Sequence, residues 1–147
     1  MSYRISANII VGCNVSFVYK LWKDVEKFPL FMKDIVSIHA IDPVKSHWKM
    51  RLAPGIEMQW DAVIIEDKPD AIIRWKSIGD TVGSSGEVLL RKENERDTFV
   101  QVNMSYYFPL EFLGNMFLKI MKNPADKLES DLHRFKKYSE ALCKRQN

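Results

Sequence analysis

The chain has 147 residues, of which 46% are hydrophobic and 28% are charged, and its formal net charge is +3. This length and composition predict one domain, residues 1–147, with a single core, and they exclude a disordered chain. Acidic residues interrupt almost every basic cluster and no apolar stretch approaches the length of a membrane span, so we expect no nucleic-acid partner and a cytoplasmic location.

The two cysteines, Cys13 and Cys143, lie near opposite ends of the chain. They form no C-x-x-C pair, and neither has metal-ligand spacing to any of the three histidines, His39, His47 and His133. We therefore expect two reduced thiols in a reducing compartment, although the sequence is also compatible with a bond between them. We predict no metal site and no cofactor.

The first predicted elements are one strand and two short helices. Residues 4–11 alternate between apolar and polar side chains, as in a half-buried strand. Asn14 is a candidate N-cap for a helix whose apolar stripe continues to Val25. Because proline favours the first position of a helix, Pro29 predicts a second short helix over residues 29–32.

The segment from Ile35 to Tyr107 has the pattern of six further strands, separated by turn-forming residues at 42–43, 53–55, 67–70, 79–80 and 93–97. The connections are too short for parallel crossovers, so we predict an antiparallel meander. Beyond Pro109, apolar residues recur every three to four positions, which predicts a long helix. Pro124 predicts a kink near residues 122–124, with a break into two helices as the alternative.

These elements predict an α+β fold in which a curved, seven-stranded antiparallel sheet wraps around the long C-terminal helix, with the two short helices between the first and second strands. The positions that face inward carry large, soft side chains, which suit either a tightly packed core or a cavity for an apolar ligand. The candidate ligand contacts are Phe28, Phe31, Met32, Trp48, Met50, Met58, Trp60, Trp75, Ser77, Met104, Tyr106, Phe117 and Met121.

Five segments, residues 18–32, 59–62, 73–77, 86–88 and 131–136, together resemble the helix-grip superfamily. This superfamily includes START lipid-transfer domains, polyketide cyclases, the major birch-pollen allergen and coenzyme Q-binding proteins. The closest resemblance is to its polyketide cyclase/dehydrase and coenzyme Q-binding branch, and it spans nearly the whole chain. The resemblance implies a helix-grip fold and an internal cavity for a hydrophobic small molecule, such as a polyketide, a quinone or a lipid.

The resemblance also bears on catalysis. In the aromatic polyketide cyclases, the strand that corresponds to Trp60 carries an inward serine and an inward arginine at alternate positions. Here Ala62 and Ile64 occupy those positions, and neither can donate a proton or polarise a carbonyl. We therefore predict binding or transport of a hydrophobic small molecule, with a polyketide cyclase/dehydratase as the alternative and no assigned catalytic residue.

Other polar groups have possible roles near the ligand. Three polar side chains are predicted to point inward, where each can hydrogen-bond a ligand oxygen. They are Tyr106, which we rank first, Ser77 and Glu66. The glycine-rich segment 79–86 is predicted to be a mobile hairpin at the cavity mouth. The facing elbow, residues 28–32, either acts as its gate or packs onto the sheet.

The last helix is rich in basic residues, namely Arg134, Lys136, Lys137, Lys144 and Arg145. This pattern predicts either a solvated face or a transient, salt-sensitive contact with an anionic membrane. The sequence makes no prediction of the oligomeric state.

Overall fold

The computed structural model describes residues 2–79, 83–107 and 124–146. Seven antiparallel strands form one sheet in the order β1-β7-β6-β5-β4-β3-β2, which confirms the predicted meander and the α+β class. The strands are β1 (Ser2–Val11), β2 (Ile35–Ala40), β3 (Lys45–Ala53), β4 (Ile56–Lys68), β5 (Ile72–Ile78), β6 (Gly83–Lys92) and β7 (Thr98–Tyr107). The described helices are α1 (Val15–Lys23), the 3-10 helix η1 (Val25–Leu30) and α3 (Pro124–Gln146).

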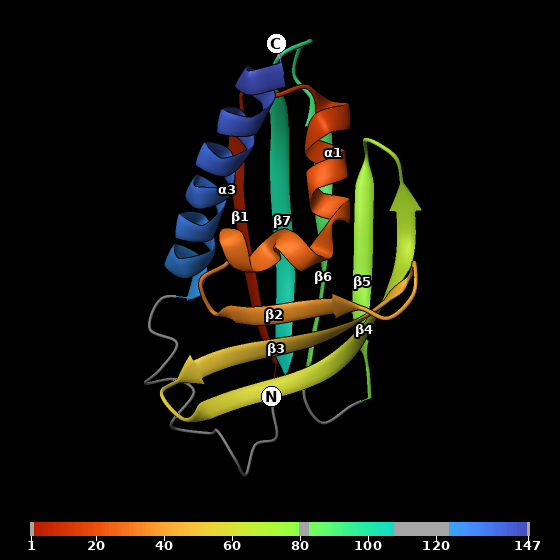
Figure 1. Ribbon diagram of the computed structural model, residues 1–147, viewed down its shortest axis with the longest axis vertical. Helices are drawn as coiled ribbons and strands as arrows, with labels where there is room; N and C mark the ends of the chain where they lie inside the picture. The colour runs from red at the N-terminus through yellow and green to blue at the C-terminus, as the bar shows by residue number, and fades with distance from the viewer. Residues whose placement is uncertain (1, 80–82, 108–123, 147) are drawn as a thin grey trace.

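The sheet is strongly curved. Figure 1 shows β1, β7, β6 and β5 standing roughly upright, while β2 and β3 run across them, with α3 and α1 on the same side of the sheet. The 13-residue strand β4 belongs to both halves, and its register with β5 shifts between Ile64 and Glu66. Such an irregularity bends a strand and increases its local twist.

The same irregularity overturns the prediction that Glu66 points inward. Ile64 lies opposite Trp75, a buried residue of the concave face, whereas Glu66 lies opposite Arg74, whose side chain points to the other face. The Glu66 carboxylate accepts a hydrogen bond from the Arg74 guanidinium on this convex face. The extra residue therefore reverses the alternation on which the prediction rested.

The two short helices follow directly from β1. Asn14 caps α1 as predicted, because its Oδ1 accepts a hydrogen bond from the Phe17 amide over 2.9 Å. The second helix was predicted wrongly: η1 begins at Val25 and has Pro29 inside it, rather than at its start. The fixed φ of proline also suits a 3-10 helix, so Pro29 need not begin a new element.

The elbow after α1 packs into the core, in agreement with the packing alternative. Phe28 and Phe31 are no more than 2% exposed, and the ring centroid of each lies 5.4 Å from that of Trp22. Phe135 of α3 completes this cluster, with its ring centroid 4.5 Å from Trp22. The predicted kink or break lies at the boundary of the described residues, from which α3 continues to Gln146.

The expectation of two free thiols is wrong, because Cys13 and Cys143 form a disulfide with their Cα atoms 6.0 Å apart. Residue 13 follows the end of β1, and residue 143 lies near the end of α3. These two ends meet because α3 packs along β1, where the Gly12 amide donates a 2.7 Å hydrogen bond to Glu140 Oε2. The pairing is therefore a consequence of helix docking, which sequence spacing does not reveal.

Candidate ligand-binding site

The side chains on the concave face form rows that cross the strands, because residues opposite one another in an antiparallel sheet share a face. Aromatic and methionine side chains occupy most of these positions. One row contains Ile38, Trp48 and Trp60; a second contains Ile35, Met50 and Met58; a third contains Ile64, Trp75, Gly86, Met104 and Ile5.

Three tryptophans are the largest feature of this face. Trp48 stacks on both Trp60 and Trp75, with ring centroids 6.0 Å apart and interplanar angles of 23° and 20°. All three residues are at least 94% buried. The stacked rings therefore make the middle of the concave face broad and apolar.

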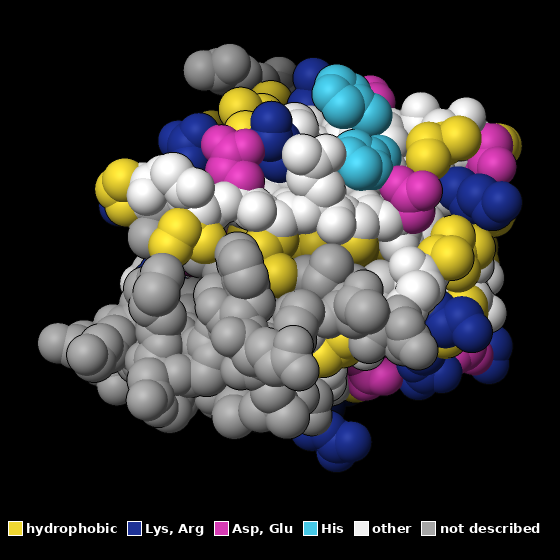
Figure 2. All heavy atoms as spheres, turned by 90° about the horizontal axis from the view of Figure 1, so that it is seen from below, with side chains coloured by type: hydrophobic (Ala, Val, Ile, Leu, Met, Phe, Trp, Pro, Cys, Tyr) yellow, Lys and Arg dark blue, Asp and Glu magenta, His cyan; other side chains and the backbone are white. Residues whose placement is uncertain are grey.

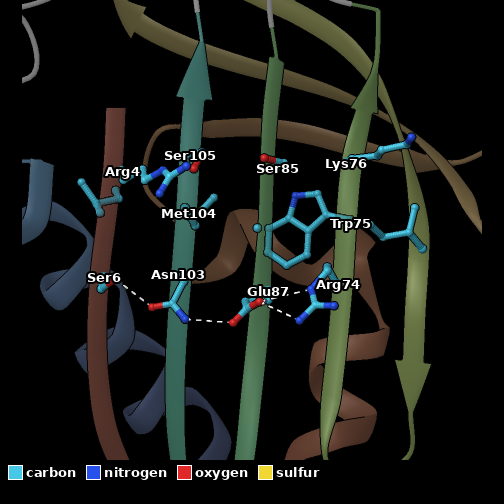
Figure 3. A pocket seen from close by; sticks show the side chains of 13 residues that line it. Arg4, Ser6, Arg74, Trp75, Lys76, Ser85, Glu87, Asn103, Met104 and Ser105 are labelled. Carbon is cyan, nitrogen blue, oxygen red and sulfur yellow. Dashed lines mark hydrogen bonds and ion pairs between the residues drawn. The ribbon is translucent and has the colours of Figure 1, made fainter. Parts of the chain in front are cut away.

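Gly86 creates the space in which Trp75 lies. A Cβ added at this position would meet the Asn103 carbonyl oxygen at 2.6 Å and Trp75 Cζ2 at 3.0 Å. Figure 3 shows the Trp75 ring beside β6, the strand that contains Gly86. The absence of a side chain at residue 86 therefore allows the indole to lie close to the sheet.

The indole N–H groups differ in their hydrogen bonding. Trp48 Nε1 donates to Ser46 Oγ over 2.8 Å, so this donor is satisfied within the protein. In the described part of the chain, Trp60 Nε1, Trp75 Nε1 and Ser84 Oγ are buried without a hydrogen-bond partner, as is Trp22 Nε1 in the aromatic cluster. A buried donor without an acceptor costs about 1–3 kcal/mol.

Tyr106 lies at the end of this face nearest α3. Its hydroxyl donates a weak hydrogen bond to Met104 Sδ over 3.6 Å. A void of about 20 Å³, enough for one water molecule, lies between Tyr106, Met50, Asp34 and Asp131. Burial raises the pKa of Tyr106, and the nearby charges of Asp131 and Asp34 raise it further, so the phenol keeps its proton.

Asp131 sets the electrostatics behind this void. Burial raises the pKa of its carboxyl group, although hydrogen bonds from Arg134 and the Lys33 amide oppose this shift. Asp34 is paired with Lys127 over 3.2 Å. The end of the concave face near α3 is therefore polar, whereas the tryptophan rows are apolar.

Ser77, the remaining polar candidate, is also buried on the concave side, opposite Ala62. Its hydroxyl is hydrogen-bonded to the Tyr107 hydroxyl. This partner makes Ser77 less available to a ligand than Ser84. A second void of about 20 Å³ lies near Ala62, between Trp22, Trp48 and Trp75.

The predicted contact residues are largely brought together. Those from Phe28 to Tyr106 are all buried, and the strand residues among them line the concave face; their role as ligand contacts remains a prediction. Phe117 and Met121 lie outside the described residues. Sequence reasoning missed Ser84, although it alternates with Gly86 and Val88, because the glycine-rich segment was taken for a loop that in fact enters β6 at Gly83.

Histidine side chains gather on the lower face of the molecule (Figure 2). His39 and His47 lie opposite each other on β2 and β3, and His47 contacts Asp61. Within the described ranges, no group of three or more His, Cys, Asp or Glu side chains is arranged to hold a metal ion. No described helix combines the length and apolar character needed to cross a membrane.

Comparison with known proteins places this geometry in a family. The family model for "Polyketide cyclase / dehydrase and lipid transport" matches residues 11–133. An uncharacterized 17.2 kDa protein of Streptomyces lincolnensis is 28% identical over 139 residues, which cover 93% of this chain and 89% of that protein.

Solved structures share the fold of this chain. The crystal structure of a Deinococcus radiodurans protein is 29% identical, with a TM-score of 0.74 over 95% of this chain and 98% of that one. The Zhui aromatase/cyclase from Streptomyces sp. R1128 has the same fold at 13% identity, with a TM-score of 0.73 over 95% and 94% of the two chains. The chain therefore belongs to the polyketide cyclase/dehydrase and lipid transport family.

Proposed function

We propose that the chain binds an apolar, unsaturated small molecule that carries carbonyl or hydroxyl oxygens, as polyketides and quinones do. The observation that carries this proposal is the set of buried donors that have no partner among the described residues, namely Trp60 Nε1, Trp75 Nε1 and Ser84 Oγ, on an otherwise apolar face. A ligand oxygen that accepts from one of them recovers part of the cost of burying it. The family's description, which names polyketide chemistry and lipid transport, supports the same class of ligand.

The stacked tryptophans favour a flat ligand over a saturated acyl chain. Trp48, Trp60 and Trp75 present parallel ring faces, on which aromatic molecules gain contact area and favourable stacking. Met50, Met58 and Met104 lie in the adjoining rows, and their flexible side chains adapt to irregular shapes. The surface therefore recognises ring systems by contact and their oxygens by hydrogen bonds.

Binding can be tested with two flat molecules of similar shape, anthraquinone and anthracene, of which only the first carries oxygens. We expect the native protein to bind anthraquinone more tightly in calorimetric titrations. Trp60→Phe and Trp75→Phe keep an aromatic ring but remove an N–H, so they should weaken anthraquinone binding about tenfold and leave anthracene nearly unaffected.

Trp48→Phe is the matched control, because it removes an indole N–H that Ser46 already satisfies. It should leave the preference for anthraquinone unchanged. Equal losses of both ligands in all three variants would show that the tryptophans act by shape alone. Failure of the native protein to bind either molecule would remove this class of ligand from the proposal.

A cyclase or dehydratase activity is the second candidate, and Tyr106 is the observation that favours it. A buried phenol that keeps its proton can hydrogen-bond a substrate carbonyl and stabilise an enolate. Ala62 and Ile64 supply no further acid or base. Tyr106→Phe should therefore slow turnover of a linear polyketide analogue while binding is preserved; an unchanged rate would exclude this role.

A further inference from the structure

The convex face of the sheet, opposite the tryptophan rows, is hollowed by a trough of about 470 Å³. We call it the outer trough. Figure 3 shows it from close by, with side chains from β1, β7, β6 and β5 along it. The polar residues that line it are Arg4, Ser6, Arg74, Lys76, Ser85, Glu87, Asn103 and Ser105.

One row of the outer trough is closed by its own hydrogen bonds. Ser6 Oγ donates to Asn103 Oδ1 over 2.7 Å, and Asn103 Nδ2 donates to Glu87 Oε2 over 3.0 Å. Arg74 donates to the other oxygen of Glu87 over 3.0 Å and also pairs with Glu66. The charged groups and hydrogen-bond donors of this row are therefore already paired within the protein.

The neighbouring row has a different character. Lys76 lies opposite Ser85, Ser85 opposite Ser105, and Ser105 opposite Arg4, so four strands contribute one residue each. These four side chains make no hydrogen bond or ion pair with any other described residue. Two hydroxyl groups thus lie between two cations that have no anionic partner in the described part of the structure.

The lengths of these side chains explain the hollow shape. Ser85 and Ser105 are short and half-buried, while Arg4 and Lys76 are long and exposed at the two ends. Neighbouring strands are about 4.8 Å apart, so the two cations begin about 14 Å apart and can reach inward by roughly half that distance each. In Figure 3, Arg4 extends from β1 over β7 toward Ser105, and Lys76 lies at the other end of the row.

The charge balance of the outer trough selects an anion. Its lining includes three cations, but Arg74 is paired with both Glu87 and Glu66, which leaves Arg4 and Lys76 as the cations without an anionic partner among the described residues. The Arg4 guanidinium and the hydroxyl groups of Ser105 and Ser85 lie on successive strands, and together they offer several hydrogen-bond donors to a phosphate group, which accepts several hydrogen bonds at once. A flat membrane surface would not reach serines that are recessed between long side chains.

We propose that the outer trough binds the phosphate group of a soluble phosphate monoester. The group lies over Ser85 and Ser105, with the Arg4 guanidinium as its main contact and Lys76 as the second cation. This site lies on the opposite face of the sheet from the tryptophan rows. Evidence against the small-molecule ligand proposed above would therefore not count against phosphate binding here.

Amide NMR spectra recorded during titration with inorganic phosphate test the proposal, with chloride at matched ionic strength as the reference. We expect saturable shifts of the Ser85 and Ser105 amide signals with phosphate only. Arg4→Gln should weaken phosphate binding about tenfold, because it removes a charge-assisted hydrogen-bonding group. The double variant S85A/S105A should weaken it at least threefold.

Lys45→Gln is the matched control, since it removes one exposed positive charge from β3 outside the trough; its affinity should stay within twofold of the native value. The dispersion of the same spectra shows whether each variant is folded. Shifts that grow linearly without saturation, or equal losses in Arg4→Gln and Lys45→Gln, would overturn the proposal. So would sedimentation with phosphatidic acid vesicles in the absence of any response to inorganic phosphate.

Discussion

Cys13 and Cys143 are joined by a disulfide although 130 positions separate them in the sequence. The bond connects the segment after β1 to the last turns of α3. On either side of it, Thr98 Oγ1 donates to the Cys13 carbonyl over 2.8 Å, and Glu140 accepts from the Gly12 amide. The C-terminal helix is therefore anchored covalently to the sheet whose concave face it covers.

Reduction of this disulfide should destabilise the fold. A bond that closes so long a loop restricts the unfolded chain strongly, and its loss typically costs about 2–5 kcal/mol. We expect the midpoint of urea unfolding to fall when a reductant is added. The variant C13S/C143S should have the same urea midpoint as the reduced native protein, and adding a reductant should not change it. An identical midpoint for the oxidised and reduced native protein would show that the disulfide does not stabilise the fold.

Asn14 should contribute to stability as the cap of α1. Its side-chain oxygen accepts from the Phe17 amide, one of the donors left free at a helix start. Asn14→Ala should lower the free energy of unfolding by about 1 kcal/mol, whereas Asn14→Asp retains an acceptor and should change it by only a few tenths. Thermal or urea unfolding of the two variants measures this difference, and equal losses would argue against a capping effect.

Gly86 should be intolerant of any side chain. Because an added methyl group would approach a backbone oxygen and the Trp75 ring too closely, Gly86→Ala should cost about 1–3 kcal/mol and alter the environment of Trp75. Urea unfolding and tryptophan fluorescence would report both effects. Ser85→Ala, on the opposite face of the same strand, should stay within about 0.5 kcal/mol of the native stability. If the two variants behave alike, the close approach at Gly86 has no energetic effect.

The regular alternation of apolar and polar side chains along the strands made much of the fold predictable. Val100 and Val102 occupy alternate positions of one strand and are both fully buried, and Asn14 caps α1 where the sequence places it. Each of these features depends on residues that are close together in the sequence. Local patterns therefore specified the strand faces, the meander and the first helix.

Features that depend on register or on docking were not predictable in this way. Glu66 lies on the convex face and not on the predicted concave face. One irregular position in β4 reverses which side chains face inward in the rest of that strand. The disulfide depends on where α3 docks, and Ser84 was missed because a segment rich in glycine and serine resembles a loop. The outer trough requires the register of four strands, since Arg4 and Lys76 are far apart in the sequence.

His47 provides a pH-dependent contact on the lower face. Its Nδ1 lies 2.7 Å from Asp61 Oδ1, and its Nε2 lies 2.9 Å from Gln59 Oε1. A protonated imidazole donates to both oxygens, so these contacts, with Asp61 first, raise the pKa of His47 above its ordinary value of 6.5. The contribution to stability is therefore complete below pH 6.5 and is lost as the pH rises through the raised pKa.

Asp61→Asn should accordingly lower the pKa of His47 toward 6.5, which an NMR titration of the imidazole signals measures directly. The effect on stability should be small, about 0.5 kcal/mol or less, because the His47 side chain is 37% exposed and solvent screens the pair. It should appear only below the raised pKa of His47, where the native imidazole is protonated. Glu95→Gln removes a carboxylate elsewhere and should leave the pKa of His47 unchanged. If the pKa of His47 is the same in Asp61→Asn as in the native protein, Asp61 does not stabilise the protonated imidazole.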